Sequence, residues 1–96
     1  MNGHITMHIT IRGRVQGVGY RAWTTQAARR LGLAGWVRNR ENGDVEAMAH
    51  GPAASVESLV AACKKGPTFA RVDDVQSESV PTPANIAEDF QQLPTI

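Results

Sequence analysis

A glycine-rich stretch near the N-terminus holds the residues that could do chemistry. It reads Gly13-Arg14-Val15-Gln16-Gly17-Val18-Gly19-Tyr20-Arg21. An alternating apolar–polar run precedes it and residues at helical spacing follow it, so it joins a strand to a helix. Gly17 and Gly19 can adopt φ values closed to other residues, which turns neighbouring N–H groups toward one point. Because a helix N-terminus adds further free N–H groups, the stretch predicts an oxyanion pocket that suits phosphate.

Arg21 stands where the expected helix begins. Its permanently charged guanidinium can grip two phosphate oxygens, and each charge-assisted hydrogen bond contributes about 1.5–3 kcal/mol. The stretch lacks the Gly-Lys-Ser/Thr ending of a P-loop and the glycine spacing of a dinucleotide motif, which argues against a nucleotide. The alternative from residues alone is a tight turn with Arg21 on the surface.

Asn39 is the second candidate for a catalytic role. It ends the run Gly35-Trp36-Val37-Arg38-Asn39, although asparagine is disfavoured in strands. The two strands of a strand–helix–strand crossover run parallel, so Asn39 is expected level with the glycine stretch. A carboxamide both donates and accepts hydrogen bonds, which suits orienting a water for attack on phosphorus. The alternative is that Asn39 caps the turn at Asn42-Gly43.

Alternation, helical spacing and turn residues predict the elements that must position these groups. Asn42-Gly43 between two strand-like runs predicts a tight hairpin with positive φ at both central residues. Pro52 is expected to open the second helix, and Pro94 confines any late strand to a sheet edge. The expected elements are a strand over 5–12, a helix from Tyr20 that stops at Gly32, strands over 35–41 and 44–50, a helix with Lys64 and Lys65 at its C-terminal end, a strand over 70–79 and an edge strand around 90–93.

This order predicts a ferredoxin-like α/β sandwich (βαββαβ) that forms a single domain over residues 1–96. Two helices should cover one face of a mostly antiparallel sheet of four to five strands. The sandwich units themselves should have only antiparallel neighbours. Cys63 completes an apolar stripe with Val56, Leu59 and Val60, so it is expected in the core rather than in catalysis.

Composition narrows the classes of function. The formal net charge is +1 and no run of lysine or arginine exceeds two residues, which argues against nucleic-acid and membrane-surface binding. An RNA-binding sandwich would place exposed aromatic residues on a central strand, and residues 44–50 contain none. The single cysteine indicates a reducing, cytoplasmic environment. A metal site at His4, His8 and His50 is the alternative to exposed strand histidines, and we expect no metal or other cofactor.

Several motifs together resemble the acylphosphatase family. They are the stretch from Gly13 to Arg21, Gly35-Trp36-Val37-Arg38-Asn39, Gly51-Pro52, and Gly66-Pro67 with Ala70-Arg71-Val72. The resemblance spans about residues 5 to 80. It implies a small α/β sandwich that hydrolyses the carboxyl–phosphate bond of acyl phosphates to a carboxylate and inorganic phosphate, without a metal or a covalent intermediate.

The resemblance also implies roles for particular residues. Arg21 matches the arginine that binds phosphate, and Asn39 matches the asparagine that positions the attacking water. The main-chain N–H groups of Val15, Gln16, Gly17, Val18, Gly19 and Tyr20 match the phosphate cradle. The substrate's own phosphate is implied as acceptor of the water's proton, and a monomer is expected. The polar tail Phe90-Gln91-Gln92-Leu93-Pro94 departs from the family pattern. The alternative function is a non-catalytic phosphate- or carbamoyl-phosphate-binding module of a larger maturation enzyme.

Overall fold

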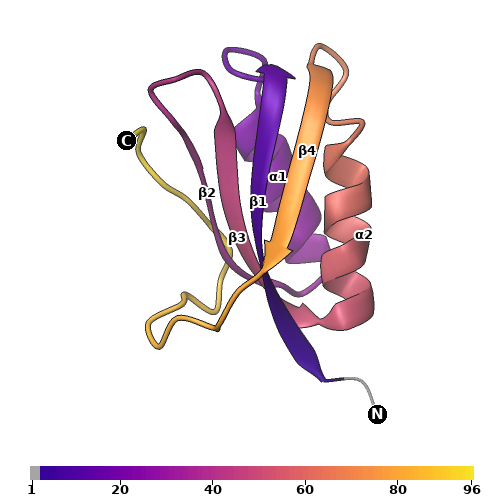
Figure 1. Ribbon diagram of the computed structural model, residues 1–96, viewed down its shortest axis with the longest axis vertical. Helices are drawn as coiled ribbons and strands as arrows, with labels where there is room; N and C mark the ends of the chain where they lie inside the picture. The colour runs from indigo at the N-terminus through magenta and orange to yellow at the C-terminus, as the bar shows by residue number, and fades with distance from the viewer. Residues whose placement is uncertain (1–2) are drawn as a thin grey trace.

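The computed structural model describes residues 3–96 and confirms the expected order of elements (Figure 1). Both helices cover one face of a five-stranded sheet, so the ferredoxin-like α/β sandwich is confirmed. Pro52 precedes the second helix as its N-cap instead of occupying the first helical position. The elements are β1 (His4–Arg14), α1 (Tyr20–Arg30), β2 (Ala34–Asn39), β3 (Val45–Pro52), α2 (Ala53–Cys63), β4 (Arg71–Ser79) and β5 (Gln91–Gln92).

The strands lie in the order β4-β1-β3-β2-β5. The first four are antiparallel to their neighbours, as expected for the sandwich units. The short β5 pairs parallel with β2, so the antiparallel expectation does not extend to this edge. The reason is geometric. β4 ends at the same end of the sheet at which β2 begins, so the chain crosses that end and then runs along β2 in the same direction (Figure 1). The tail continues this pairing, with the Leu93 N–H donating to the Val37 carbonyl at 2.8 Å.

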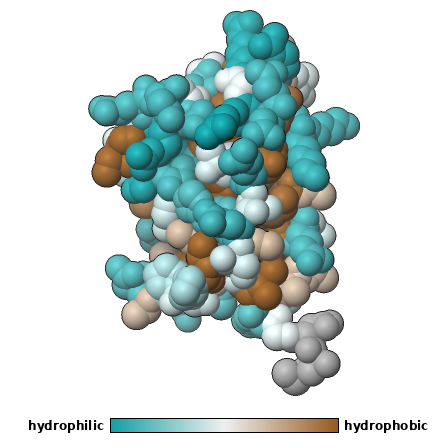
Figure 2. Space-filling model, viewed as in Figure 1, coloured by the Kyte–Doolittle hydropathy of each residue, from teal (hydrophilic) through white to brown (hydrophobic). Residues whose placement is uncertain are grey.

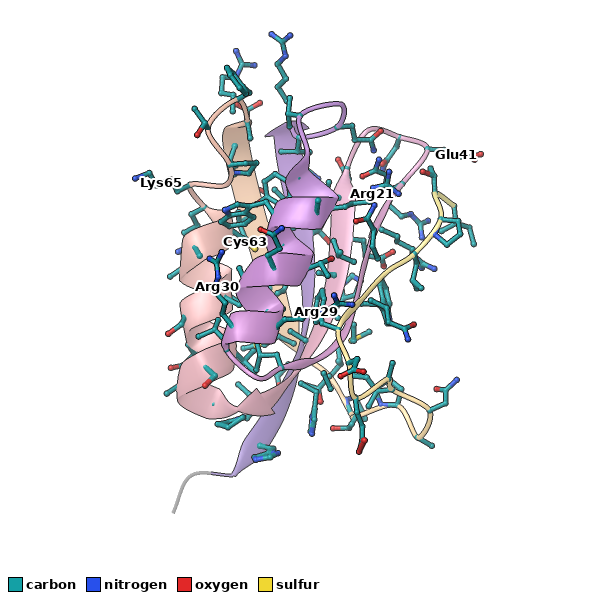
Figure 3. The ribbon with its side chains drawn as sticks, turned by 180° about the vertical axis from the view of Figure 1, so that it is seen from behind. Arg21, Arg29, Arg30, Glu41, Cys63 and Lys65 are labelled. Carbon is teal, nitrogen blue, oxygen red and sulfur yellow. The ribbon has the colours of Figure 1, made fainter. Side chains whose placement is uncertain are left out.

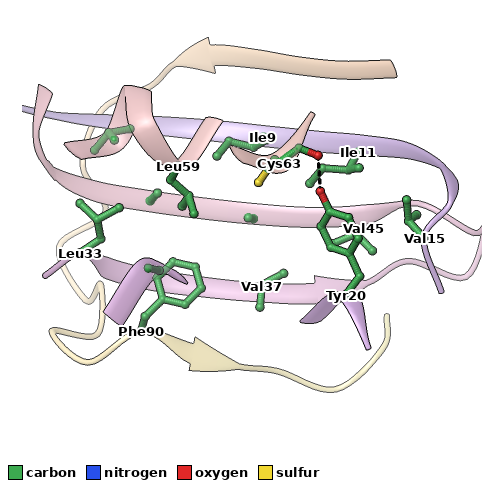
Figure 4. Packing of buried hydrophobic residues seen from close by; sticks show 14 residues of the cluster. Ile9, Ile11, Val15, Tyr20, Leu33, Val37, Val45, Leu59, Cys63 and Phe90 are labelled. Carbon is green, nitrogen blue, oxygen red and sulfur yellow. Dashed lines mark hydrogen bonds between the residues drawn. The ribbon is translucent and has the colours of Figure 1, made fainter. Parts of the chain in front are cut away.

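The core lies between the sheet and the two helices (Figure 4). Alternation on β1 turns Ile9 and Ile11 inward, where both are fully buried. Leu59 from α2 and Phe90 from the tail complete this layer, and both are also fully buried. Cys63 is buried among them, so its expected place in the core is confirmed. Burial raises the pKa of the Cys63 thiol to about 11, which keeps it protonated at neutral pH.

The opposite face of the sheet is covered mainly by hydrophilic side chains (Figure 2). At its centre, Glu46 accepts hydrogen bonds from His8 at 2.6 Å and from Arg38 at 2.7 Å. Burial acts to raise the pKa of Glu46, but the bonds from His8 and Arg38 outweigh it, so the pKa lies below its ordinary value. The Arg38 guanidinium carbon lies 4.6 Å from the centroid of the Trp36 ring, so Trp36 packs beneath Arg38 on the sheet.

The connection between β2 and β3 differs from the expected two-residue turn. The strands stop at Asn39 and resume at Val45, and no non-glycine residue in the described part of the chain has positive φ. The Gly43 N–H donates to the Arg40 carbonyl at 3.1 Å, and the Arg40 N–H donates to the Asp44 carbonyl at 2.8 Å. This is the pattern of a type I turn followed by a glycine bulge, with Gly43 at φ 100°. Positive φ at both central residues was therefore a wrong prediction.

Candidate active site

A cavity of about 150 Å³ opens where β1 passes into α1, beside the end of β2. A cavity of about this volume accommodates a benzene-sized molecule, so this one has room for a phosphate group and a water. The structure thus brings Arg21 and Asn39 to one small space, although they lie on different elements. The cavity is lined by Val15, Gln16, Gly17, Gly19, Tyr20, Arg21, Ala22, Asn39 and Gln92.

The main chain of the β1–α1 connection forms one wall of this cavity. Gly17 has φ 75° and Gly19 has φ 79°, left-handed conformations that side chains rarely adopt. Gly19 is the N-cap of α1, no side chain caps this helix end, and its first turn carries no acidic residue. The helical ladder opens with the Trp23 N–H donating to the Gly19 carbonyl at 3.0 Å. The N–H groups of residues 20–22 therefore precede the ladder and make this end electropositive.

Buried side chains hold both ends of the connection in place. Val15 is fully buried, and Tyr20 reaches the core, where its hydroxyl donates to the Cys63 carbonyl at 2.5 Å (Figure 4). Burial raises the pKa of Tyr20 above its ordinary value, so the hydroxyl stays protonated and acts as an anchor. Val18 is half-buried, packs against the core and does not line the cavity. The connection is thus fixed by its ends while its glycines shape the middle.

Arg21 is half-buried and lies on the side of α1 that faces the C-terminal segment (Figure 3). One terminal nitrogen, Nη1, donates to the Leu93 carbonyl at 3.2 Å. A second arginine of the same helix, Arg29, donates to the Phe90 carbonyl at 3.0 Å, but it lies outside the cavity lining. The tail therefore restrains the Arg21 fork at one nitrogen and leaves its other N–H donors for a ligand.

Asn39 is the last residue of β2 and lines the same cavity. Both β1 and β2 are antiparallel to β3 and hence parallel to each other, which brings the end of β2 level with the start of α1. The Asn39 main-chain carbonyl accepts a hydrogen bond from the Ile96 N–H at 3.1 Å. The side chain that closes the neighbouring turn is Asn42, whose Oδ1 accepts from the Asp44 N–H at 3.0 Å. This bond assigns the alternative capping role to Asn42.

Sequence reasoning missed two residues of the lining, Ala22 and Gln92. The position of Ala22 in the first helical turn could have indicated it, because that turn contributes free N–H groups. Gln92 had no such signal, because its place depends on the pairing of β5 with β2. A larger hollow of about 600 Å³ lies on the open face of the sheet, lined by His8, Thr10 and residues 75–78. It contains no helix N-terminus and no arginine.

Comparison with known proteins assigns the family. The sequence profile of the acylphosphatase family matches residues 7–92. The chain belongs to the acylphosphatase family. It is 52% identical to an acylphosphatase of Nitrobacter hamburgensis over 96 residues, covering 96% of this chain and 97% of that protein. It is 50% identical to an acylphosphatase of Rhodospirillum rubrum over 91 residues, covering 95% of this chain and 98% of that protein.

Solved structures agree with this assignment. The crystal structure of acylphosphatase from Bacillus subtilis matches with a TM-score of 0.87 at 36% identity, covering 93% of this chain and 98% of that chain. The crystal structure of full-length HypF matches with a TM-score of 0.88 at 24% identity, covering 99% of this chain and 12% of that chain, which shows the shared fold alone. Among the described residues, no helix is long and apolar enough to cross a membrane.

Proposed function

We propose that this member of the acylphosphatase family hydrolyses acyl phosphates without a metal, by in-line attack of a water that Asn39 positions. One observation carries the proposal: the N-terminal end of α1, Arg21 and Asn39 line a single cavity of about 150 Å³. A phosphate bound there would meet electropositive groups on one side and a carboxamide on another. The products are a carboxylate and inorganic phosphate.

The β1–α1 connection and Arg21 bind the phosphate. Main-chain N–H groups of the connection that line the cavity donate to its oxygens, and the guanidinium donates through nitrogens that the tail does not occupy. In phosphoryl transfer, charge spreads over the equatorial oxygens in the transition state. Fixed N–H dipoles and a positioned guanidinium stabilise that charge without reorganising, because the buried anchors at Val15 and Tyr20 already hold them.

Asn39 positions the water. Its carboxamide oxygen accepts a hydrogen bond from the water, whose oxygen then attacks phosphorus opposite the leaving group. As the new P–O bond forms, the bond between phosphorus and the acyl oxygen breaks and its electron pair leaves on the carboxylate. The water's proton passes to a phosphate oxygen. A carboxyl group has a pKa of about 4, so the leaving group departs as an anion without a general acid.

The residues of the cavity favour a metal-independent reaction. Positive charge comes from Arg21 and from helix N–H groups, and the described residues of the lining include no carboxylate, imidazole or thiol. Thiolates, imidazoles and carboxylates are the usual ligands of a resident Zn²⁺, and one or two carboxylates usually hold Mg²⁺. Electrostatic stabilisation here therefore relies on groups of the chain itself.

The test combines Asn39→Ala with a chelator. We expect phosphate release from an aryl acyl phosphate to be unchanged by EDTA. Asn39→Ala should lower kcat at least about 100-fold, the range that mutagenesis gives for one catalytic hydrogen-bonding group. Inorganic phosphate should still inhibit within about threefold of its wild-type Ki, because the cradle and Arg21 remain. The matched control is Asn85→Ala, in an exposed turn outside the cavity. Turnover of folded Asn39→Ala within twofold of wild type would remove the water-positioning role.

The alternative is a non-catalytic module that binds phosphate or carbamoyl phosphate. The same cavity would then bind the anion, and the Asn39 carboxamide would be a ligand of the phosphate. The two functions separate in one assay series: phosphate binding without release of phosphate from acyl phosphates supports the module. Phosphate release that Asn39→Ala abolishes supports the hydrolase.

We also propose that the chain acts as a monomer in the cytoplasm on small-molecule substrates. The only cysteine is free and buried in the core, so it does not offer an exposed thiol for a disulfide between copies of the chain. Specific activity independent of protein concentration, with elution at 10.4 kDa in gel filtration, is the expected result. Activity that falls on dilution would contradict the monomer.

A further inference from the structure

Gln16 lines the cavity, and its side chain also bonds to the β2–β3 hairpin. Gln16 belongs to the β1–α1 connection, yet its Nε2 donates to the Arg40 carbonyl at 2.8 Å and to the Asp44 carbonyl at 2.9 Å. Both acceptors belong to the β2–β3 hairpin, immediately beyond Asn39. Both N–H donors of one carboxamide are thus used on the element that carries the proposed water-positioning residue.

The hairpin is a rigid acceptor for this contact. The two carbonyls that Gln16 reaches lie at the neck of the turn, where the Arg40 N–H also bonds the Asp44 carbonyl at 2.8 Å. The Gly43 N–H donates to the Arg40 carbonyl at 3.1 Å, and the Asp44 N–H donates to Asn42 Oδ1 at 3.0 Å. Since each carbonyl already has a main-chain donor, Gln16 adds a second bond to both and fixes the connection to the hairpin.

Strand pairing does not make this link. The sheet order places β3 between β1 and β2, so no ladder joins the two strands that carry the cradle and Asn39. Both strands reach the start of β3 at one residue, because Ile11 and Asn39 each pair with Val45. Past this pair, no strand lies between the β1–α1 connection and the β2–β3 hairpin. The Gln16 side chain spans the gap between these two segments.

We propose that Gln16 is a positioning residue, which sets the Asn39 carboxamide against the N–H cradle and thereby controls turnover rather than anion binding. The inference rests on the proposed function. A water held by Asn39 must lie in line with the bond that breaks, and a misplacement of about 1 Å can lower a rate about 100-fold. Anion binding by the cradle and Arg21 does not depend on the hairpin in this way, so the two properties should separate.

The test is Gln16→Met, which keeps the length of the side chain and removes both donors. The Arg40 and Asp44 carbonyls keep their main-chain donors, so neither is left unsatisfied. We expect kcat to fall about 10- to 100-fold, while the Ki of inorganic phosphate stays within threefold of wild type. The matched control is Gln26→Met on the exposed side of α1, with kcat within twofold of wild type. If Gln16→Met does not fold, Gln16→Asn, which is too short to reach the hairpin, replaces it with the same expectation.

A double-mutant cycle separates positioning from a merely structural role. If Gln16 acts through Asn39, adding Gln16→Met to Asn39→Ala lowers kcat less than twofold further. Three results would each overturn the inference. The first is that the two substitutions lower kcat by factors that multiply in the double variant. The others are a kcat of Gln16→Met within twofold of wild type, and a phosphate Ki that weakens in parallel with kcat. Full activity of Gln16→Met beside an inactive Asn39→Ala would sink this inference alone. Retained activity of Asn39→Ala would instead remove the proposed function on which it rests.

Discussion

Replacing Arg21 by lysine tests the contribution of the guanidinium fork. In the structure one nitrogen of Arg21 donates to the Leu93 carbonyl at 3.2 Å, which leaves the fork free to give a phosphate two further hydrogen bonds. Lysine keeps the positive charge but cannot hold the tail carbonyl and two phosphate oxygens in one geometry. The substitution therefore removes at least one charge-assisted hydrogen bond to the anion and leaves the net charge of the protein unchanged.

The expected magnitude follows from the bonds lost. One charge-assisted hydrogen bond contributes about 1.5–3 kcal/mol, and a tenfold change corresponds to about 1.4 kcal/mol. Arg21→Lys should therefore lower kcat/KM about 10- to 150-fold. Arg21→Met loses two such bonds and the charge, about 3–6 kcal/mol, and should lower kcat/KM about 150- to 20,000-fold. Initial rates with benzoyl phosphate measure both, and inhibition by inorganic phosphate shows whether binding weakens in parallel.

Arg29→Lys is the matched control. Arg29 lies on the same helix and donates to another tail carbonyl, that of Phe90, but it is outside the cavity lining. We expect its kcat/KM within twofold of wild type. The reasoning is refuted if folded Arg21→Lys keeps more than half of the wild-type kcat/KM. It is also refuted if Arg29→Lys loses as much as Arg21→Lys, because the loss would then come from the tail.

Two further substitutions test the fold around the site. Glu46→Gln should destabilise the protein by about 1–2 kcal/mol at pH 7, because it removes charge-assisted bonds from His8 and Arg38. The pKa of Glu46 is lower in the folded protein than its ordinary value of 4.5. This stabilisation is therefore present at pH values above 4.5 and is lost as the pH falls from there through the lowered pKa. Thermal unfolding of Glu46→Gln and wild type should therefore converge in acid, and a gap that persists there would contradict the assignment. Gly13→Ala should lower Tm by more than about 10 °C, because a Cβ at φ 134° would lie 2.2 Å from the Arg71 carbonyl oxygen and separate β1 from β4. Gly43→Ala, also at positive φ but in open space, should lower it by less than half as much, and equal losses would show that the clash is not the cause.

The glycine conformations and the helix start at the β1–α1 connection could be predicted because their physics is local. Glycines that permit positive φ, a helix N-terminus and an arginine in the first turn are all properties of neighbouring residues. Asn39 could be placed from topology, because a crossover makes β1 and β2 parallel and brings their ends to one level. The structure puts Arg21 and Asn39 in one cavity, and the roles assigned to them stay predictions.

Other features depend on contacts that leave no residue signature. The Gln16 and Arg21 side chains donate hydrogen bonds to the main-chain carbonyls of Arg40, Asp44 and Leu93. Because every residue has a main-chain carbonyl, the sequence does not mark these acceptors. The direction of β5 was set by where β4 ends, which no local pattern records. The hairpin misled for a different reason. An Asn-Gly pair suits two kinds of turn, and the hydrogen bond from the Asp44 N–H to the Asn42 side chain accompanies the longer one.

The most direct test of the account is a crystal structure of the protein with inorganic phosphate. We predict one phosphate in the cavity, within hydrogen-bond distance of main-chain nitrogens of residues 15–20 and of the Arg21 guanidinium, with the Asn39 carboxamide facing a water beside it. A phosphate bound outside this cavity, or bound there with Arg21 and Asn39 both beyond hydrogen-bond distance of the anion and its water, would contradict the account.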